Sequence, residues 1–252
     1  MPSRPLIVSI EGNIGAGKTT IIDKLQEKMR ANTDILFLRE PVDIWEGIKD
    51  PETGENILQK FYGNPSKYAF SFQVMAYATR ISLIREAIRN NKHCKMIICE
   101  RSLDADKQIF AQMLHDDGMI DNVHFQIYNR FYTEYSDDFS LNGIVYIDAD
   151  ADICHQRIAK RSRTGEGGIE LAYLEKCKSY HDNWLLHNSI ETDVLRIHAN
   201  DEVSYDLSDI NDKGGVWVNQ IEKYIYEQIA THTHNDHYLH NSASSRGDYV
   251  FA

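Results

Sequence analysis

The sequence predicts an α/β fold, in which a five-stranded parallel sheet carries helices on both faces. Five short runs are continuously apolar at their centres instead of alternating, as strands covered on both faces are. The longer stretches between these runs have helical periodicity, which gives the β-α-β order of right-handed crossovers. The predicted strands are residues 6–10, 35–40, 95–100, 143–148 and 194–199.

Size and composition favour one large domain. The chain has 252 residues, and we expect a domain over 1–231 followed by a flexible polar tail over 232–252. The formal net charge of -11 argues against a nucleic-acid binder, whose affinity depends on Lys and Arg meeting phosphates. The longest apolar runs are of strand length, and the start lacks the character of a signal or transit peptide. We therefore expect no membrane partner and a cytoplasmic location.

The first strand leads into "EGNIGAGKTT", which fits G-x-x-x-x-G-K-[ST] with a strand before it and a helical pattern after it. Glycines let backbone N–H groups converge on phosphate oxygens, and the helix N-terminus adds partial positive charge. We expect Lys18 to reach the β- and γ-phosphates and the Thr19 hydroxyl to bind Mg²⁺. No N-K-x-D motif follows a later strand, so we expect ATP as the nucleotide. The predicted nucleotide-binding loop is Gly12, Asn13, Ile14, Gly15, Ala16, Gly17, Lys18, Thr19 and Thr20.

A long insertion follows the second strand. No strand signal occurs between residues 45 and 91, where the segment 65–90 predicts a long helix opened by Pro65 at its first turn. A second aromatic-rich helix is predicted over 122–135, before the fourth strand. Together these helices suggest a bundle on one side of the sheet, which buries either core or a subunit partner.

Charged residues follow the third and fourth strands. Ligands of open parallel sheets collect at the carboxyl ends of the strands, so Glu100 should lie beside the phosphate loop, and Arg101 can neutralise phosphoryl charge. Arg157 and Arg161 lie four residues apart on one helix face, with Arg163 just beyond. We interpret about 157–168 as a lid that closes over the transferred group; a solvated basic helix end is the alternative.

The last predicted helix covers 214–230, and a His-rich polar segment follows it. No cysteine or carboxylate cluster completes a metal site there, so a solvated tail is the expectation. The four cysteines lack zinc-like or redox-like spacing and are expected to be reduced; they are Cys94, Cys99, Cys154 and Cys177.

Six motifs, "EGNIGAGKTT", "EPVDIW", "NILQKFY", "FSFQVMAYATR", "ERSLDADKQIF" and "RIAKRSRTGEGGIELAYLEKCKSYHDNWLLH", occur in the order and spacing of the deoxynucleoside kinases. From about residue 6 to 230 the chain resembles this family. The resemblance implies the P-loop kinase fold, ATP- and Mg²⁺-dependent phosphorylation of the 5′-hydroxyl of a deoxynucleoside, and a homodimer formed through the two long helices.

The resemblance also implies residue roles. Glu100 matches the general base and, with Thr19, a metal-binding position, while Arg101 matches a residue that orients the site. Glu40 matches an acid near the 5′-hydroxyl. The lid arginines are Arg157, Arg161 and Arg163, and Tyr62 with Glu166 match the pair that binds the 3′-hydroxyl. The apolar walls around the base are Trp45, Leu58, Phe72 and Phe110. Asp201 and Val203 match, more loosely, the loop that packs on the ATP base.

The base preference depends on the long helix. Gln73, Ala76 and Arg80 share one helix face, and the Gln73 amide can both donate to and accept from a base edge. Arg80 and Asp106 match an Arg–Asp pair of the deoxycytidine and deoxypurine kinases, which favours those substrates over thymidine. Three alternatives stay open: a nucleoside monophosphate kinase such as a thymidylate kinase, a thymidine-preferring deoxynucleoside kinase, and a non-catalytic relative acting as an interaction subunit.

Overall fold

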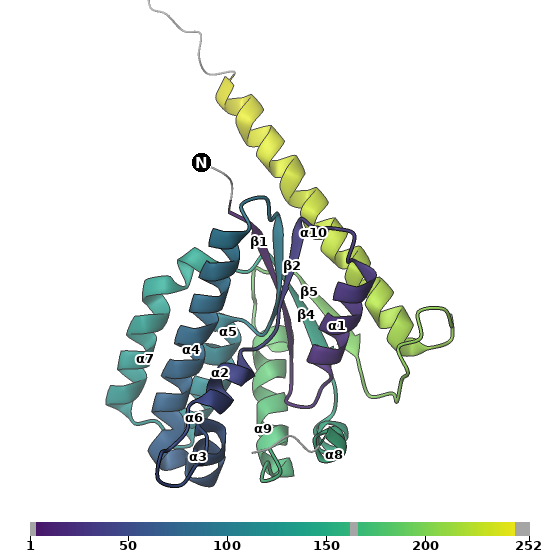
Figure 1. Ribbon diagram of the computed structural model, residues 1–252. Coiled ribbons are helices and arrows are strands. Elements are labelled where there is room, and N and C mark those ends of the chain that lie inside the picture. Colours follow the sequence, from purple (N-terminus) through teal and green to yellow (C-terminus); the bar gives the residue numbers. More distant parts are fainter. Residues whose placement is uncertain (1–3, 162–165, 245–252) are drawn as a thin grey trace, which may run out of the picture.

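The computed structural model describes residues 4–161 and 166–244 (Figure 1). Side chains are described up to residue 232. Its centre is a five-stranded sheet in the order β2-β3-β1-β4-β5, in which every neighbouring pair is parallel. The strands are β1 Leu6–Gly12, β2 Ile35–Leu38, β3 Met96–Glu100, β4 Gly143–Asp148 and β5 Val194–His198. The predicted fold class and all five strands are confirmed, although β1 runs two residues further than expected and β2 ends two residues earlier.

Helices cover both faces of the sheet (Figure 1). On one face, Val8 and Ile10 of β1 pack with α1 (Lys18–Lys28) and α10 (Lys213–Ser244). On the other, Ile7 packs with α4 (Pro65–Asn90) and α7 (Asn122–Tyr135), both at the predicted bounds. This alternation along β1 is the physical reason for its continuous apolar run, because both faces of the strand are buried.

Shorter elements complete the chain between the strands. They are α2 Val42–Gly47, α3 Ile57–Gly63, α5 Leu103–Ala105, η1 Asp106–Ala111, α6 Gln112–Asp116, η2 Asp137–Phe139, α8 Ala151–Arg161, α9 Leu171–Asp182 and η3 Asn183–His187. A capping box starts α3: the Asn56 side chain accepts from the Gln59 N–H, and the Gln59 side chain accepts from the Asn56 N–H, each at 2.9 Å. This cap fixes a helix that the sequence pattern left unassigned within the long insertion.

The last helix differs from its prediction. We expected it to end near residue 230, but α10 continues to Ser244, so the His-rich segment up to that residue is helical. The reason is the absence of a helix breaker, because no glycine or proline lies between Gly215 and Gly247. Residues 245–252 lie outside the described part of the chain. None of the helices in the described ranges is long and apolar enough to cross a membrane.

Candidate active site

A cavity of about 650 Å³ opens at the carboxyl ends of the central strands. Its lining comes from the loop after β1, from α2, α3 and α4, from the end of β3, and from η1, α8 and the segment after β5. The strand register explains this convergence, because Ile10 of β1 lies level with Glu100 of β3, and Gly12 lies level with Ile147 of β4. Segments far apart in the sequence therefore contribute to one site.

The loop between β1 and α1 requires glycine at the two motif positions, Gly12 and Gly17, and also at Gly15. Gly12, Gly15 and Gly17 have φ of 147°, 82° and 100°, a region that other residues rarely adopt. A Cβ at Gly12 would lie 2.5 Å from the Ile147 carbonyl oxygen. The loop is thus packed against β4 by its backbone, which leaves its N–H side to a ligand.

Lys18 is turned back onto this loop. Its Nζ donates to the carbonyl oxygens of Asn13, at 2.8 Å, and Gly12, at 3.1 Å. Burial and, to a smaller extent, the charge of Arg101 together lower the pKa of Lys18 to about 8, against the opposing effect of Glu100. The ammonium is therefore weakly solvated and suited to a phosphate.

Thr19 and Glu100 meet at the mouth of the loop. The Thr19 hydroxyl donates to Glu100 Oε1 at 2.7 Å, and the Glu40 N–H points at Glu100 Oε2 at 3.5 Å. The Thr19 hydroxyl and the Glu100 carboxylate supply oxygen atoms, which are the ligands that Mg²⁺ prefers. Proteins usually hold Mg²⁺ by one or two such oxygens, and phosphates and water supply the remaining ligands. Among the described residues no group of three or more His, Cys, Asp or Glu side chains could hold a metal. The donor set thus fits a nucleotide-borne Mg²⁺.

Arg80 is the centre of a buried network. Its Nε and Nη2 donate to the two Asp106 carboxylate oxygens at 2.9 and 3.2 Å, in a bidentate pair. Its Nη2 also contacts Glu40 at 3.0 Å, and its Nη1 donates to the Glu100 carbonyl oxygen at 2.8 Å. Burial alone would lower the pKa of Arg80, but Asp106 and Glu40 outweigh it and raise the pKa, so the guanidinium stays charged.

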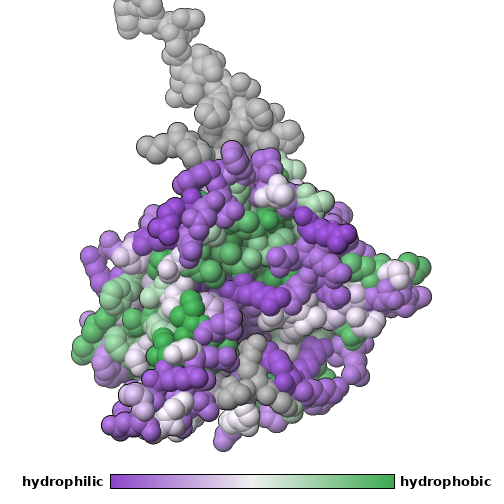
Figure 2. Space-filling view, viewed as in Figure 1, coloured by the Kyte–Doolittle hydropathy of each residue, from purple (hydrophilic) through white to green (hydrophobic). Residues whose placement is uncertain are grey.

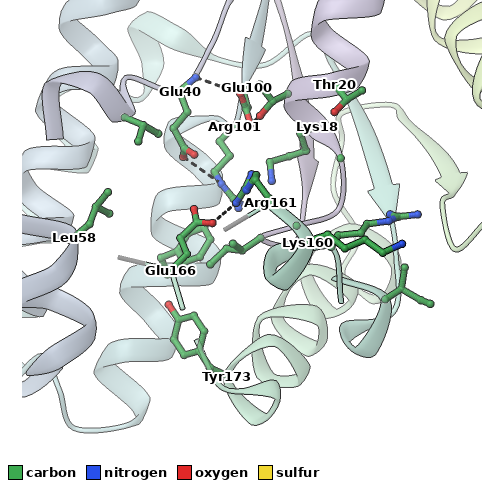
Figure 3. A pocket seen from close by; sticks show the side chains of 18 of the residues that line it. Lys18, Thr20, Glu40, Leu58, Glu100, Arg101, Lys160, Arg161, Glu166 and Tyr173 are labelled. Carbon is green, nitrogen blue, oxygen red and sulfur yellow. Dashed lines mark hydrogen bonds and ion pairs between the residues drawn. The ribbon is translucent and has the colours of Figure 1, made fainter. Parts of the chain in front are cut away.

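Arg101 and Glu40 point toward one another in Figure 3, with 3.3 Å between Nε and Oε1. The Arg101 guanidinium also lies over the Phe110 ring, 4.6 Å from its centroid. Burial raises the pKa of Glu40, but Arg101 and Arg80 together outweigh this effect and lower it. Arg101 Nη1 has no hydrogen-bond partner among the described residues, so it can donate to a ligand.

An apolar wall faces these charges. The rings of Phe61 and Phe72 stack at 4.7 Å, and Trp45 meets Phe72 edge-on at 5.5 Å. Trp45 is itself fixed, because its indole N–H donates to the Thr79 hydroxyl at 3.0 Å. Gln73 is 2% exposed and lines the same cavity, so a planar ring inserted against this wall would meet its amide.

The lid region is described only in part. Arg161 forms an ion pair with Glu166 across residues 162–165 (Figure 3). Arg157 donates to the carbonyl oxygens of Ala16, at 3.3 Å, and Asp201, at 2.8 Å. Arg163 lies outside the described residues.

Most predicted site residues line the cavity. Those that do are Ile14, Gly15, Gly17, Lys18, Thr19, Thr20, Glu40, Trp45, Leu58, Tyr62, Phe72, Gln73, Ala76, Glu100, Arg101, Asp106, Phe110, Arg157, Arg161, Glu166 and Val203. Those that the structure places outside the lining are Gly12, Asn13, Ala16, Arg80 and Asp201. Arg80 lies behind the lining residues Asp106 and Glu40, which its guanidinium contacts. Asn13 turns into the protein, where its side chain donates to the Leu174 carbonyl oxygen at 2.8 Å. The Asp201 carboxylate pairs with Lys213 at 2.6 Å.

Sequence reasoning missed several lining residues, among them Phe61, Lys160, Tyr173 and Tyr205. Phe61 lies in "NILQKFY" and Tyr173 in "GGIELAYLEK", so their aromatic side chains within these motifs could have indicated a place in the lining. Tyr173 meets Tyr62 edge-on at 6.5 Å, which places it beside the predicted sugar site. Tyr205 carried no signal, because its position depends on the path of a loop.

Comparison with known proteins agrees with this arrangement. A family model described as deoxynucleoside kinase matches residues 8–226. A probable deoxycytidine kinase of Fowlpox virus (strain NVSL) is 36% identical over 198 residues, which cover 76% of this chain and 78% of the relative. The deoxycytidine kinase of Mus musculus is 29% identical over 237 residues, covering 86% of this chain and 90% of the relative. A mitochondrial deoxyguanosine kinase of Xenopus laevis is 28% identical over 202 residues, covering 73% and 74%. The chain therefore belongs to the deoxynucleoside kinase family.

Proposed function

We propose that this protein transfers the γ-phosphoryl group of ATP to the 5′-hydroxyl of a deoxynucleoside, and that it prefers deoxycytidine or a deoxypurine to thymidine. The observation that carries the preference is the buried Arg80–Asp106 pair, whose Asp106 lines the cavity together with Gln73. Asp106, held by Arg80, can accept a hydrogen bond from an exocyclic amine, which cytosine and adenine have. Thymine would present a carbonyl oxygen to that carboxylate instead.

The nucleotide side of the reaction rests on the loop after β1. Its backbone N–H groups would bind phosphate oxygens, and Lys18 would exchange its two carbonyl partners for the phosphate chain. Thr19 and Glu100 would hold Mg²⁺, which when bound neutralises charge between the phosphates. Arg157 and Arg161 both line the cavity, and Arg157 donates to the Ala16 carbonyl oxygen of this loop, so these arginines can stabilise the transferred group.

On the acceptor side, we propose Glu100 as the base that accepts the 5′-hydroxyl proton. Glu40 is the other carboxylate that could serve as the base. Burial raises its pKa, but Arg101 and Arg80 lower the pKa by more, so Glu40 is a weak proton acceptor. Tyr62 and Glu166 line the cavity together and would bind the 3′-hydroxyl. Arg101 would orient the reacting oxygen through its unpartnered Nη1.

The alternative of a monophosphate kinase has less support. Such an enzyme needs a cationic pocket for the phosphate of its acceptor. On the side of the cavity formed by β3, α4 and η1, the guanidinium groups of Arg80 and Arg101 are already paired with Glu40 and Asp106, and Glu100 adds another carboxylate. A non-catalytic role is disfavoured because Lys18 and Glu100 are both retained within the cavity.

We also propose a homodimer formed through α4 and α7. Val123, Ile127 and Phe131 of α7 are 66%, 42% and 45% exposed, and their spacing of four residues puts them on one helix face. Figure 2 shows hydrophobic residues gathering over α7, at the left edge of the view. A second copy of the chain would remove this stripe from water.

The test is a panel of steady-state kcat/KM values for the four deoxynucleosides and their monophosphates, with ATP as donor. We expect turnover of deoxynucleosides only, with deoxycytidine or a deoxypurine ahead of thymidine. Turnover of monophosphates but not deoxynucleosides would overturn the proposed acceptor. A thymidine preference would overturn the role given to the Arg80–Asp106 pair.

A further inference from the structure

Tyr205 has an unusual backbone and an unusual position. Its φ is 58°, a left-handed conformation that costs a non-glycine residue about 1 kcal/mol or more. Figure 1 shows its segment leaving β5 and turning back into α10 on the side of α1. The Tyr205 hydroxyl lies 3.5 Å from the point where a Cβ on Gly17 would stand, so it reaches the phosphate loop.

The surrounding segment is built to hold this side chain. The Tyr205 ring meets Trp217 edge-on at 6.3 Å. A Cβ on Gly214 would lie 2.9 Å from Tyr205 Cδ1, so glycine is what lets the ring sit against the start of α10. The Asp212 carboxylate accepts from the Ser204 hydroxyl and from the N–H groups of Asp206 and Gly214, the last two at 2.8 Å. These hydrogen bonds tie Ser204 and Asp206, the two neighbours of Tyr205 in the chain, to Asp212 and so fix the backbone around the tyrosine.

The hydroxyl itself is left for a ligand. It has no hydrogen-bond partner among the described residues, although Tyr205 lines the cavity together with Gly17, Lys18 and Arg157. Burial raises the pKa of Tyr205, so the phenol keeps its proton and can donate. A donor fixed beside a phosphate loop suits an anionic oxygen, and hydrogen bonds to charged acceptors are the stronger ones.

We propose that Tyr205 is a donor-nucleotide contact, whose hydroxyl donates to a phosphate oxygen of ATP while its ring shields the loop at Gly17 from water. This inference rests on the proposed function, in which the loop after β1 binds ATP. It adds to the phosphate-binding residues a side chain that the motif does not contain.

The test measures the Kd of ATP and of inorganic tripolyphosphate for the unmodified protein and for Tyr205→Phe. The phenylalanine keeps the packing on Trp217, so the melting temperature should stay unchanged. We expect Kd for both ligands to rise about tenfold. The KM for the deoxynucleoside should not change, a separation that loss of structure alone would not produce.

Two further variants sharpen the test. Gly214→Ala should displace the tyrosine ring and raise the Kd of both ATP and tripolyphosphate. Ile210→Ala is the matched control, because Ile210 belongs to the same segment and is 87% exposed; it should leave both Kd values unchanged.

The outcomes separate the two proposals. If the unmodified protein binds neither ATP nor tripolyphosphate, the proposed function falls and this inference falls with it. If it binds both and Tyr205→Phe binds them equally well, only the inference is overturned. A loss of ATP affinity without a loss of tripolyphosphate affinity also overturns it, because the contact would then be to the nucleoside.

Discussion

Replacing the Arg80–Asp106 pair by apolar side chains, in the double variant Arg80→Met with Asp106→Ala, should raise the activity on thymidine relative to deoxycytidine. In the unmodified protein, thymine would leave a buried carboxylate oxygen facing a carbonyl oxygen. A buried acceptor without a donor costs about 1–3 kcal/mol, which corresponds to about 5- to 150-fold in kcat/KM. Because the double variant removes that acceptor, the ratio of thymidine to deoxycytidine activity should rise by at least about tenfold.

The same pair predicts the stability of the variants. Arg80→Met alone removes the partner of the buried Asp106 carboxylate and one of the two partners of the half-buried Glu40 carboxylate. Asp106→Ala alone leaves a buried guanidinium with one carboxylate fewer. Breaking a buried pair typically costs about 3–5 kcal/mol, whereas replacing both members costs less. The double variant should therefore lose less free energy of unfolding than the two single variants added together.

The assay is kcat/KM for thymidine and deoxycytidine in the unmodified protein, both single variants and the double variant, with urea unfolding of each. Ser82→Ala on the exposed side of α4 is the control and should change neither ratio nor stability. The reasoning is refuted if the unmodified enzyme already prefers thymidine. A double variant whose substrate ratio moves by less than about threefold would refute it as well.

Other consequences of the site can be tested directly. Glu100→Gln should lower kcat by about 10²–10⁴-fold, and Glu40→Gln should lower it less; the reverse order in kcat would transfer the role of base to Glu40. Lys18 has a pKa of about 8 in the free protein, and phosphates bind its protonated form, so ATP affinity should be full below pH 8 and fall as the pH rises above it. Calorimetric titrations between pH 7 and 9.5 check this, and a flat profile would contradict it. Ile127→Asp should convert a dimer into a monomer in sedimentation velocity runs, whereas an unmodified protein that is already monomeric at micromolar concentration would refute the proposed interface.

Much of the fold follows from patterns that are local in the sequence. The five apolar runs, the start of α4 at Pro65 and the loop around Gly17 each depend on neighbouring residues only. Buried strands and a phosphate loop need the same residue types wherever they occur. The sequence therefore predicts these elements within a residue or two, and the ends of β1 and β2 show the full difference of two residues.

The parts that could not be predicted depend on contacts across the chain. Nothing next to Arg80 indicates that its guanidinium meets Glu40, Asp106 and the Glu100 carbonyl group at once. The position of Tyr205 over the phosphate loop follows from a closed segment after β5 and from a glycine in the following helix. The polar, His-rich composition after residue 230 predicts an earlier end of α10 than the structure has, because composition alone does not end a helix where no breaker occurs.

At Arg101 the backbone conformation favours one residue type and the proposed role of the side chain requires another. Its φ of 62° is a conformation that glycine adopts freely and arginine does not, while its N–H is held by the Ile10 carbonyl oxygen at 3.1 Å. Stability alone would favour glycine or asparagine at this position, whereas the proposed role of Arg101 in the reaction requires the guanidinium that lies beside Glu40. Active relatives that keep this arginine must therefore regain the lost free energy of unfolding at other positions. A relative that no longer catalyses the reaction could replace the arginine and become more stable.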